Sequence, residues 1–191
     1  MSKLFYTALI TLLSFSVHAQ NDKPVYSLFL IGDAGEPYEN PTLVLLKKEL
    51  EKVGDKGGVV FLGDNIYPQG MPPKGHPLRA KAEVAIDGQI DAVRDFNGTK
   101  VFIPGNHDWA QGRDYGLEWL NLQEDYVEDA LDSADVWLPT NGCPGPVEVN
   151  LTEQITLIVV DTQWFLHKGK KPEDNCGVQG LRDVGVLFQK P

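Results

Sequence analysis

The 191-residue chain is poor in positive charge, in cysteine and in long apolar runs. It has 17 Lys and Arg residues against 27 Asp and Glu, which gives a formal net charge of −10. A nucleic-acid-binding protein needs a basic face for the phosphate backbone, so we exclude this class. No glycine-rich loop is followed by Lys-Ser or Lys-Thr, which argues against a nucleotide-binding protein. Acidic charge does not exclude phosphate chemistry, because bound cations can reverse the local field.

Cysteine is limited to two residues, Cys143 and Cys176. Neither belongs to a Cys-x-x-Cys pair, which argues against a structural zinc site. In a cytosolic protein they would be unpaired thiols, whereas in an exported protein an even pair favours a disulfide. A disulfide that closes a loop of this size would stabilise the fold by ~3–4 kcal/mol.

One apolar stretch follows Lys3 and ends at Val17. It is shorter than the roughly 20 apolar residues that a membrane-spanning helix needs. Val17-His18-Ala19 places small residues at the two positions that an export peptidase reads. We therefore predict a signal peptide over residues 1–19, cleaved before Gln20, in preference to a membrane anchor. The protein is then exported to the periplasm, the cell envelope or the medium.

Residues 20–191 have the composition of one ordinary globular domain, with 42% hydrophobic and 23% charged residues in the whole chain. Apolar runs predict strands at 25–31, 59–62 and 101–103. Between them, apolar residues recur at three- and four-residue spacing, which predicts helices over 40–53 and 78–96. This alternation is typical of an α/β protein with parallel strands.

The first helix has clear boundary signals. Asn40 and Pro41 supply a capping side chain and a first-turn proline. We expect Gly54, Gly57 and Gly58 to end that helix before the second strand begins.

Beyond the third strand, residues 117–131 are expected to form another helix. Residues 147–149 and 155–160 read as two further strands. Residues 67–77, with four prolines and two glycines, are predicted to be a loop.

Polar side chains follow the three predicted strands, in each case directly after a glycine: Asp33, Asp64 and Asn106. In open α/β sheets, ligands bind beyond the carboxyl ends of the strands, so we expect these residues at one edge of one sheet. Carboxylate and amide oxygens are suited to a pair of metal ions about 4 Å apart. Tyr67 can add a phenolate if a trivalent metal lowers its pKa, and His107 can donate to a phosphate oxygen.

Three motifs carry a family resemblance: Gly32-Asp33-Ala34-Gly35, Gly63-Asp64-Asn65-Ile66-Tyr67 and Gly105-Asn106-His107-Asp108. They resemble the first three motifs of calcineurin-like metallophosphoesterases, and most closely the purple acid phosphatase branch. Gly35 stands where many members have histidine, but this branch uses a tyrosine that matches Tyr67. The resemblance covers nearly all of residues 20–191, and residues 141–149 and 161–164 are similar to bacterial envelope members.

The resemblance implies an α/β fold with a metallophosphoesterase-like β-sandwich flanked by helices. It implies two metal ions, iron paired with iron, zinc or manganese. Asp33 and Tyr67 would bind the first ion, Asp64 would bridge the two and Asn106 would bind the second. His107 would be the catalytic residue. The implied activity is a phosphatase that hydrolyses small phosphate esters.

The family completes its metal centre with later Gly-His-His or Gly-His-x-His motifs, which this sequence lacks. Gly75-His76 comes much too early in the chain to serve. We therefore interpret residues 20–191 as the N-terminal part of the domain. We expect weak metal binding, weak or no activity, and self-association through an uncovered sheet edge and apolar face.

The envelope members imply an association with the outer membrane through a missing C-terminal region. The alternative function is a non-catalytic envelope module that keeps the fold in order to bind or assemble.

Other polar residues have simpler interpretations. Asp108 and Trp109 are expected to be structural or to line the pocket, and Asp161 to cap or pack. His76 and His167 lie in loop-like contexts and are expected at the surface.

Overall fold

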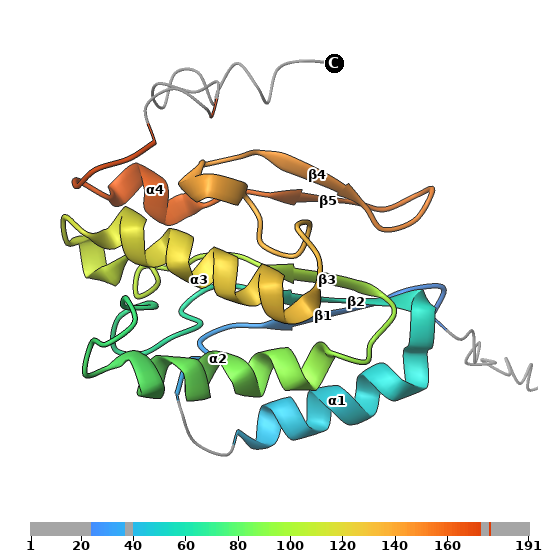
Figure 1. Cartoon of the computed structure of the whole chain (residues 1–191). Helices are drawn as coiled ribbons and strands as arrows, with labels where there is room; N and C mark the ends of the chain where they lie inside the picture. The colour runs from blue at the N-terminus through green and yellow to red at the C-terminus, as the bar shows by residue number, and fades with distance from the viewer. Residues whose placement is uncertain (1–23, 37–39, 173–175, 177–191) are drawn as a thin grey trace, which may run out of the picture.

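The computed structural model describes residues 24–36, 40–172 and 176, and it shows a mixed α/β fold (Figure 1). The predicted signal peptide, residues 1–19, lies outside the described residues. The elements are β1 (Ser27–Ile31), α1 (Pro41–Val53), β2 (Gly57–Phe61), α2 (Arg79–Val93), β3 (Thr99–Phe102), α3 (Gly116–Leu131), β4 (Val147–Asn150), β5 (Thr156–Val159) and α4 (Thr162–Leu166). Short 3₁₀ turns are η1 (Gly54–Lys56), η2 (Ala110–Gly112) and η3 (Thr140–Gly142). The predicted α/β class is confirmed.

Strands β1, β2 and β3 form a parallel sheet in that order, and β4 and β5 form an antiparallel hairpin. In the parallel sheet, Leu30 pairs with Val60, and Val60 pairs with Val101. Because the three strands run in the same direction, their carboxyl ends meet at one edge. Trp137 adds a short parallel bridge beside Phe102, on the outer side of β3.

Helix α1 begins and ends where its boundary signals predict. The side chain of Asn40 accepts from the N–H of Thr42 at 2.9 Å, and Pro41 occupies the first turn. Gly54 ends the helix with a left-handed φ of 57°, and its N–H donates to Leu50 O. These caps satisfy main-chain groups that the helix itself leaves unpaired.

The expectation that Gly57 and Gly58 also end the helix is wrong, because both belong to β2. They are needed there for close packing. A Cβ on Gly57 would lie 2.6 Å from Cγ2 of Val53, and one on Gly58 would lie 2.6 Å from the hydroxyl of Tyr26. Their absent side chains let α1 and β1 approach the start of β2.

Helices α1, α2 and α3 cover one face of the parallel sheet. Phe61 of β2 stacks on Phe102 of β3 with ring centroids 4.4 Å apart. Both rings are completely buried in a core that includes Leu46 of α1, Ile86 of α2 and Leu120 of α3. Each such side chain contributes roughly 1.5–3 kcal/mol through burial. The apolar stripe predicted for α2 is therefore the face that packs on the sheet.

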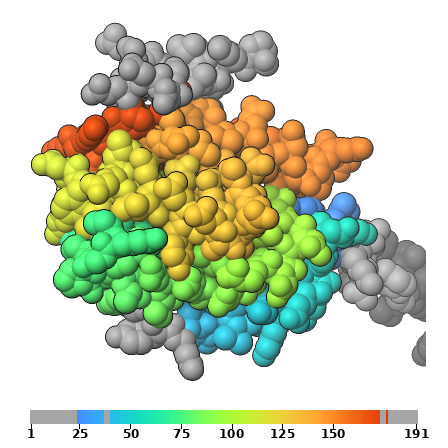
Figure 2. Space-filling model, viewed as in Figure 1, coloured from blue at the N-terminus to red at the C-terminus, as the bar shows by residue number. Residues whose placement is uncertain are grey.

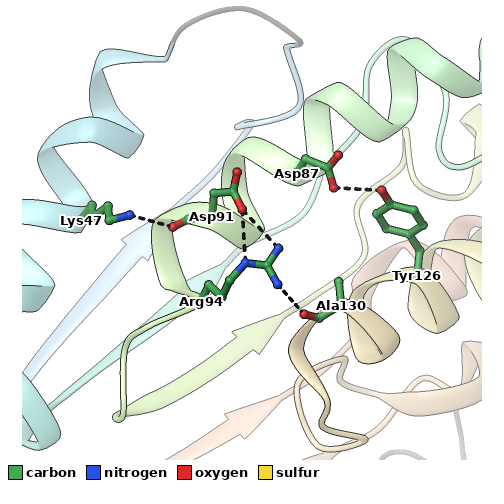
Figure 3. A network of polar contacts seen from close by, with 6 residues as sticks. All are labelled: Lys47, Asp87, Asp91, Arg94, Tyr126 and Ala130. Atoms are coloured by element: carbon green, nitrogen blue, oxygen red, sulfur yellow. Dashed lines mark hydrogen bonds and ion pairs between the residues drawn. The ribbon is translucent and has the colours of Figure 1, made fainter.

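Polar contacts join α2 to the helices on either side (Figure 3). Lys47 of α1 donates to a main-chain carbonyl of α2 at 3.4 Å. Arg94, just after α2, donates to the carbonyl of Ala130 at 2.7 Å, and Tyr126 of α3 donates to Asp87 of α2 at 2.9 Å. Burial, together with Asp87, raises the pKa of Tyr126 to about 12. These contacts hold the three helices in a fixed order behind the sheet.

The β4–β5 hairpin covers part of the other face of the parallel sheet. Its Val159 packs with Val60 of β2 and Val101 of β3, and Leu138 completes this second small core. In Figure 2 the hairpin, in orange, lies above α3, and its tip extends to the right of the view.

Three leucines on the same face of the sheet are left uncovered. Leu28, Leu30 and Leu62 are 38%, 56% and 49% exposed, and we call them the apolar strip. Among the described residues, β1 pairs only with β2, so it is also an edge strand. The expected exposed edge and apolar face are therefore present.

Cys143 and Cys176 are joined by a disulfide, which is the pairing favoured for an exported protein. It ties the segment before the hairpin to a residue beyond α4. No helix within the described ranges is long and apolar enough to cross a membrane.

Candidate functional site

The loops that follow β1, β2 and β3 are joined through their main chains. The N–H of Asp33 donates to Gly63 O at 3.1 Å, and the N–H of Tyr67 donates to Gly35 O at 3.0 Å. The N–H of His107 donates to Asp64 Oδ1 at 3.0 Å. The three motifs therefore form one structural unit at the carboxyl edge of the sheet, as the sequence predicts.

Two motif glycines allow this close approach. A Cβ on Gly35 would lie 2.6 Å from both Asp64 O and Ile66 N. A Cβ on Gly105 would lie 2.4 Å from Asp64 N and equally close to an oxygen of the Asp64 carboxylate. Both distances are shorter than real Cβ contacts, and the neighbours are largely backbone that cannot give way. Any side chain at these positions would push the loops apart.

Asp33 and Asp64 have strained backbones. Their φ angles are 56° and 55°, in the left-handed region that non-glycine residues seldom occupy. Of the six non-glycine residues with such angles in the described chain, four lie at this site: Asp33, Asp64, Ala110 and Gln111. Strain of this kind costs about 1–3 kcal/mol per residue and concentrates at functional sites. The strain therefore singles out this edge as a candidate site.

The hydroxyl of Tyr67 joins the two aspartates. It donates to Asp33 Oδ1 at 2.6 Å and lies 3.2 Å from Asp64 Oδ2. Burial, the hydrogen bonds and the negative charge of both carboxylates raise the pKa of Tyr67 above its ordinary value. Three predicted ligands, two carboxylates and one phenol, thus meet at the Tyr67 hydroxyl.

Asn106 and His107 lie beside this point. The main chain of Asn106 is next to Asp64, since the following N–H bonds to the Asp64 carboxylate, while its own side chain is exposed. The imidazole ring of His107 meets the ring of Tyr67 edge-on, with centroids 4.4 Å apart.

The orientation of His107 follows from one contact. Its Nδ1 is 2.6 Å from the carbonyl oxygen of Pro68, which can only accept, so Nδ1 carries a proton. In the neutral ring Nε2 is then the acceptor nitrogen. The same proton makes the 3.3 Å approach of the Gln111 amide nitrogen to Nδ1 a contact between two donors.

Asp108 supports the loops after β2 and β3 through its buried carboxylate. It is fully buried, and its carboxylate accepts from both nitrogens of Asn65 and from Gly105 N, at 2.7–3.2 Å. Gln123 of α3 completes the set at 2.8 Å. Burial raises the pKa of Asp108 to about 6, although these hydrogen bonds act in the opposite direction. The expected structural role of Asp108 is confirmed.

Two buried glutamines, which local sequence patterns did not single out, also hold the site. Gln123 binds Asp108, and Gln89 of α2 donates to the carbonyl of Asn65 at 2.7 Å. Both side chains are completely buried. A signal was available, because Gln89 comes three residues after Ile86 on the apolar stripe. A polar residue on such a stripe needs a buried partner.

Asp161 and His167 lie behind the site, around Trp109. Asp161 caps α4 and accepts from the indole N–H of Trp109 at 2.7 Å, so its expected capping role is confirmed. Burial raises the pKa of Asp161 to about 6. The expected surface position of His167 is wrong: it is 2% exposed, and its ring packs at a tilt against Trp109, with centroids 4.6 Å apart. His76 is half-buried against the edge of Trp119.

The donor set is made of oxygen ligands. Within the described residues, no three His, Cys, Asp or Glu side chains form a group that could hold a metal ion. The candidate ligands instead combine two carboxylates with a phenol and an amide, and such hard oxygens suit iron(III), manganese and magnesium better than soft metals.

Comparisons of this chain with protein-family models, with curated proteins and with solved structures found no match.

Proposed function

We propose that this chain provides part of a two-metal phosphoesterase centre and that the complete site hydrolyses phosphate esters. The observation that carries the proposal is the placement of the Tyr67 hydroxyl between Asp33 and Asp64, at the ends of neighbouring strands. A tyrosine proton held between two carboxylates is the proton that a trivalent cation would displace. The strained backbones of both aspartates support the same conclusion.

The residues present fit such a centre in part. Asp33 and Tyr67 would hold a first ion, Asp64 would bridge, and Asn106 would hold a second ion through its exposed amide. Iron paired with iron, zinc or manganese is the proposed content. Bound ions of this kind lower the pKa of water and neutralise charge that develops on a phosphoryl oxygen. Affinity is expected to be weak, because the histidine ligands of the family are missing.

His107 has a defined task in this proposal. Pro68 holds Nδ1–H, so the ring presents Nε2 to a substrate. A protonated Nε2 can donate to a phosphoryl oxygen or to the leaving group. The neighbouring ring of Tyr67 limits the rotation of the imidazole.

The finer fold and the location belong to the same proposal. The packing of the β4–β5 hairpin on the parallel sheet is consistent with the start of a metallophosphoesterase-like β-sandwich. We further propose export to the periplasm or envelope, for which the disulfide is supporting evidence.

Metal binding gives the direct test. Purified 20–191 is titrated with Mn²⁺ by calorimetry and loaded with iron(III) for absorption spectroscopy. We expect weak Mn²⁺ binding that is lost in Asp33→Asn and Asp64→Asn, and a visible iron–tyrosinate band that is lost in Tyr67→Phe. Asp114→Asn, an exposed aspartate outside the three motifs, is the matched control. Mn²⁺ binding that is unchanged in the first two variants would exclude this centre.

The alternative is a non-catalytic envelope module that binds or assembles. The apolar strip favours it, because large exposed apolar groups mark interaction surfaces. A chromogenic phosphate ester separates the two functions: turnover that requires Asp64 and an added metal supports the hydrolase. No turnover in the presence of added metal, with Mn²⁺ binding intact, would support the module.

A further inference from the structure

A cationic side chain, Arg113, is separated from His107 by the side chain of Gln111. Arg113 follows the 3₁₀ turn η2, and its Nη1 donates to the side-chain oxygen of Gln111 at 3.2 Å. The amide nitrogen of Gln111 is in turn 3.3 Å from Nδ1 of His107. With the amide oxygen of Gln69 turned toward it, the guanidinium also donates from Nη2 at 3.0 Å. Gln69 and Gln111 thus hold Arg113 from the two loops that also hold His107.

The turn that places these residues is strained. Ala110 and Gln111 have φ angles of 48° and 56°, and Gly112 has 80°. The turn is kept in place by its own main-chain bonds, including Gln111 N to Asn106 O at 2.8 Å. Consecutive left-handed residues that are not glycine cost free energy, and proteins keep such strain where it positions a functional group. Within this turn the side-chain oxygen of Gln111 accepts from the Arg113 guanidinium.

Within the described residues, no acidic side chain forms a salt bridge with Arg113. Its described partners are the neutral oxygens of Gln69, Gln111 and Ala110, and it is absent from the salt bridges of the described residues. The side chain is exposed, in a chain whose net charge is −10. These partners use Nη1 and one proton of Nη2. The Nε–H and the second Nη2–H remain, and on one edge they form the fork that binds a carboxylate or phosphate.

We propose that Arg113 is a specificity-determining residue that binds a second anionic group on the substrate. The preferred substrate class is then a phosphate ester that also carries a carboxylate or a second phosphate. The inference rests on the proposed function, because it assumes that the first phosphate binds at Asp33, Asp64 and His107.

The distance sets the size of such a substrate. The two contacts and the width of one amide group place the guanidinium no more than about 9 Å from the His107 ring. A substrate with one anionic group at each end of a small linker, such as a benzene ring, can reach both Arg113 and His107. A pyrophosphate, with its two phosphorus atoms joined by one oxygen, is too short to take full advantage of both.

The test compares three probes with 20–191 in the presence of Mn²⁺, by calorimetry. They are phenyl phosphate, 4-carboxyphenyl phosphate and 1,4-phenylene bisphosphate. We expect the two doubly anionic probes to bind at least about threefold more tightly than phenyl phosphate, the effect of one exposed ion pair. Arg113→Gln should remove this preference and leave the affinity for phenyl phosphate unchanged. Arg113→Lys, which keeps the charge but loses the fork, should retain part of it.

The matched control is Lys48→Gln, which removes one exposed positive charge from α1 and should change no affinity. Circular dichroism checks that each variant is folded. Equal affinity of the wild type for all three probes, or an unchanged preference in Arg113→Gln, would overturn the role of Arg113 while leaving the phosphate site intact. Binding of none of the probes would overturn the proposed function and this inference with it. Tighter binding of only one doubly anionic probe would still support Arg113 and would identify the preferred anion.

Discussion

At the scale of single residues, the positions of the candidate ligands depend on the buried carboxylate of Asp108. Asp108 accepts from four N–H groups, and these come from the second and third strand-end loops and from α3. Its neighbour His107 binds Asp64 through the main chain. Asp108 therefore sets where the candidate ligands stand without being one of them.

Replacing Asp108 with Asn should lower the free energy of unfolding by about 2–3 kcal/mol. The four N–H groups now donate to a carboxylate. In the Asn variant, an NH₂ group would replace one of its oxygens, and buried donors would face each other without an acceptor. Urea denaturation at pH 7 measures the effect. Asp114→Asn, at an exposed position, should change stability by less than about 0.5 kcal/mol. If Asp108→Asn is as stable as the control, the four hydrogen bonds do not hold the loops.

At the scale of elements, α3 is attached to η3 through a buried acid. Both carboxylate oxygens of Glu124 accept from the N–H of Asn141 at 2.8 Å, and the side chain is 5% exposed. Burial raises the pKa of Glu124 to about 7, the Asn141 N–H lowers it, and Glu128 and Asp125 raise it further. Helix α3 thus carries a carboxyl group, that of Glu124, whose ionisation is disfavoured by burial.

This attachment predicts a pH dependence of stability. In the unfolded chain Glu124 loses its proton near its ordinary pKa of 4.5, whereas the folded chain keeps it up to about pH 7. The folded state then binds more protons within this window, so the free energy of unfolding falls as pH rises through it. Glu124→Gln should remove about 3 kcal/mol of this fall. Glu118→Gln, exposed in the first turn of α3, should have the wild-type slope in urea denaturation from pH 4.5 to 7.5. Identical slopes for the two variants would argue against the shift.

At the scale of the whole molecule, a disulfide joins two segments that are distant in the sequence. Cys143 and Cys176 are 33 residues apart. Closing a loop of that length lowers the conformational entropy of the unfolded chain, which raises the free energy of unfolding by ~3–4 kcal/mol. Cys143→Ser with Cys176→Ser should lose about this much stability in urea denaturation. The double variant should be insensitive to dithiothreitol, whereas the wild type should fall to its level on reduction. A wild type that is equally stable with and without reductant would contradict the role given to the bond.

The apolar strip predicts association in solution. Leu28, Leu30 and Leu62 are exposed beside β1, whose outer edge has no partner strand among the described residues. Both features favour contact with other chains. We expect 20–191 to associate with increasing concentration in sedimentation velocity, and Leu30→Lys to shift it toward the monomer. Leu166→Lys is the matched control, since Leu166 of α4 is 72% exposed outside the strip. Equal effects of the two variants would mean that general hydrophobicity, not this surface, drives association.

Much of the fold could be predicted because its signals are local. The cap of α1 by Asn40 and Pro41, the buried stripe of α2 and the three strand ends each depend on a few neighbouring residues. Gly35 and Gly105 were recognisable as motif positions. Why glycine is needed there, namely the close approach of both residues to Asp64, is visible only in the folded chain.

The amino-acid sequence by itself determined the order of helices and strands and the arrival of Asp33, Asp64 and Asn106 at one edge, because periodicity and parallel connection follow from the local chain. Tertiary structure alone decided the burial of His167, the support by Gln89 and Gln123, and the contact of Gln69 with Arg113. These contacts join residues that helices or loops separate, and no local preference encodes which distant partner a side chain will meet.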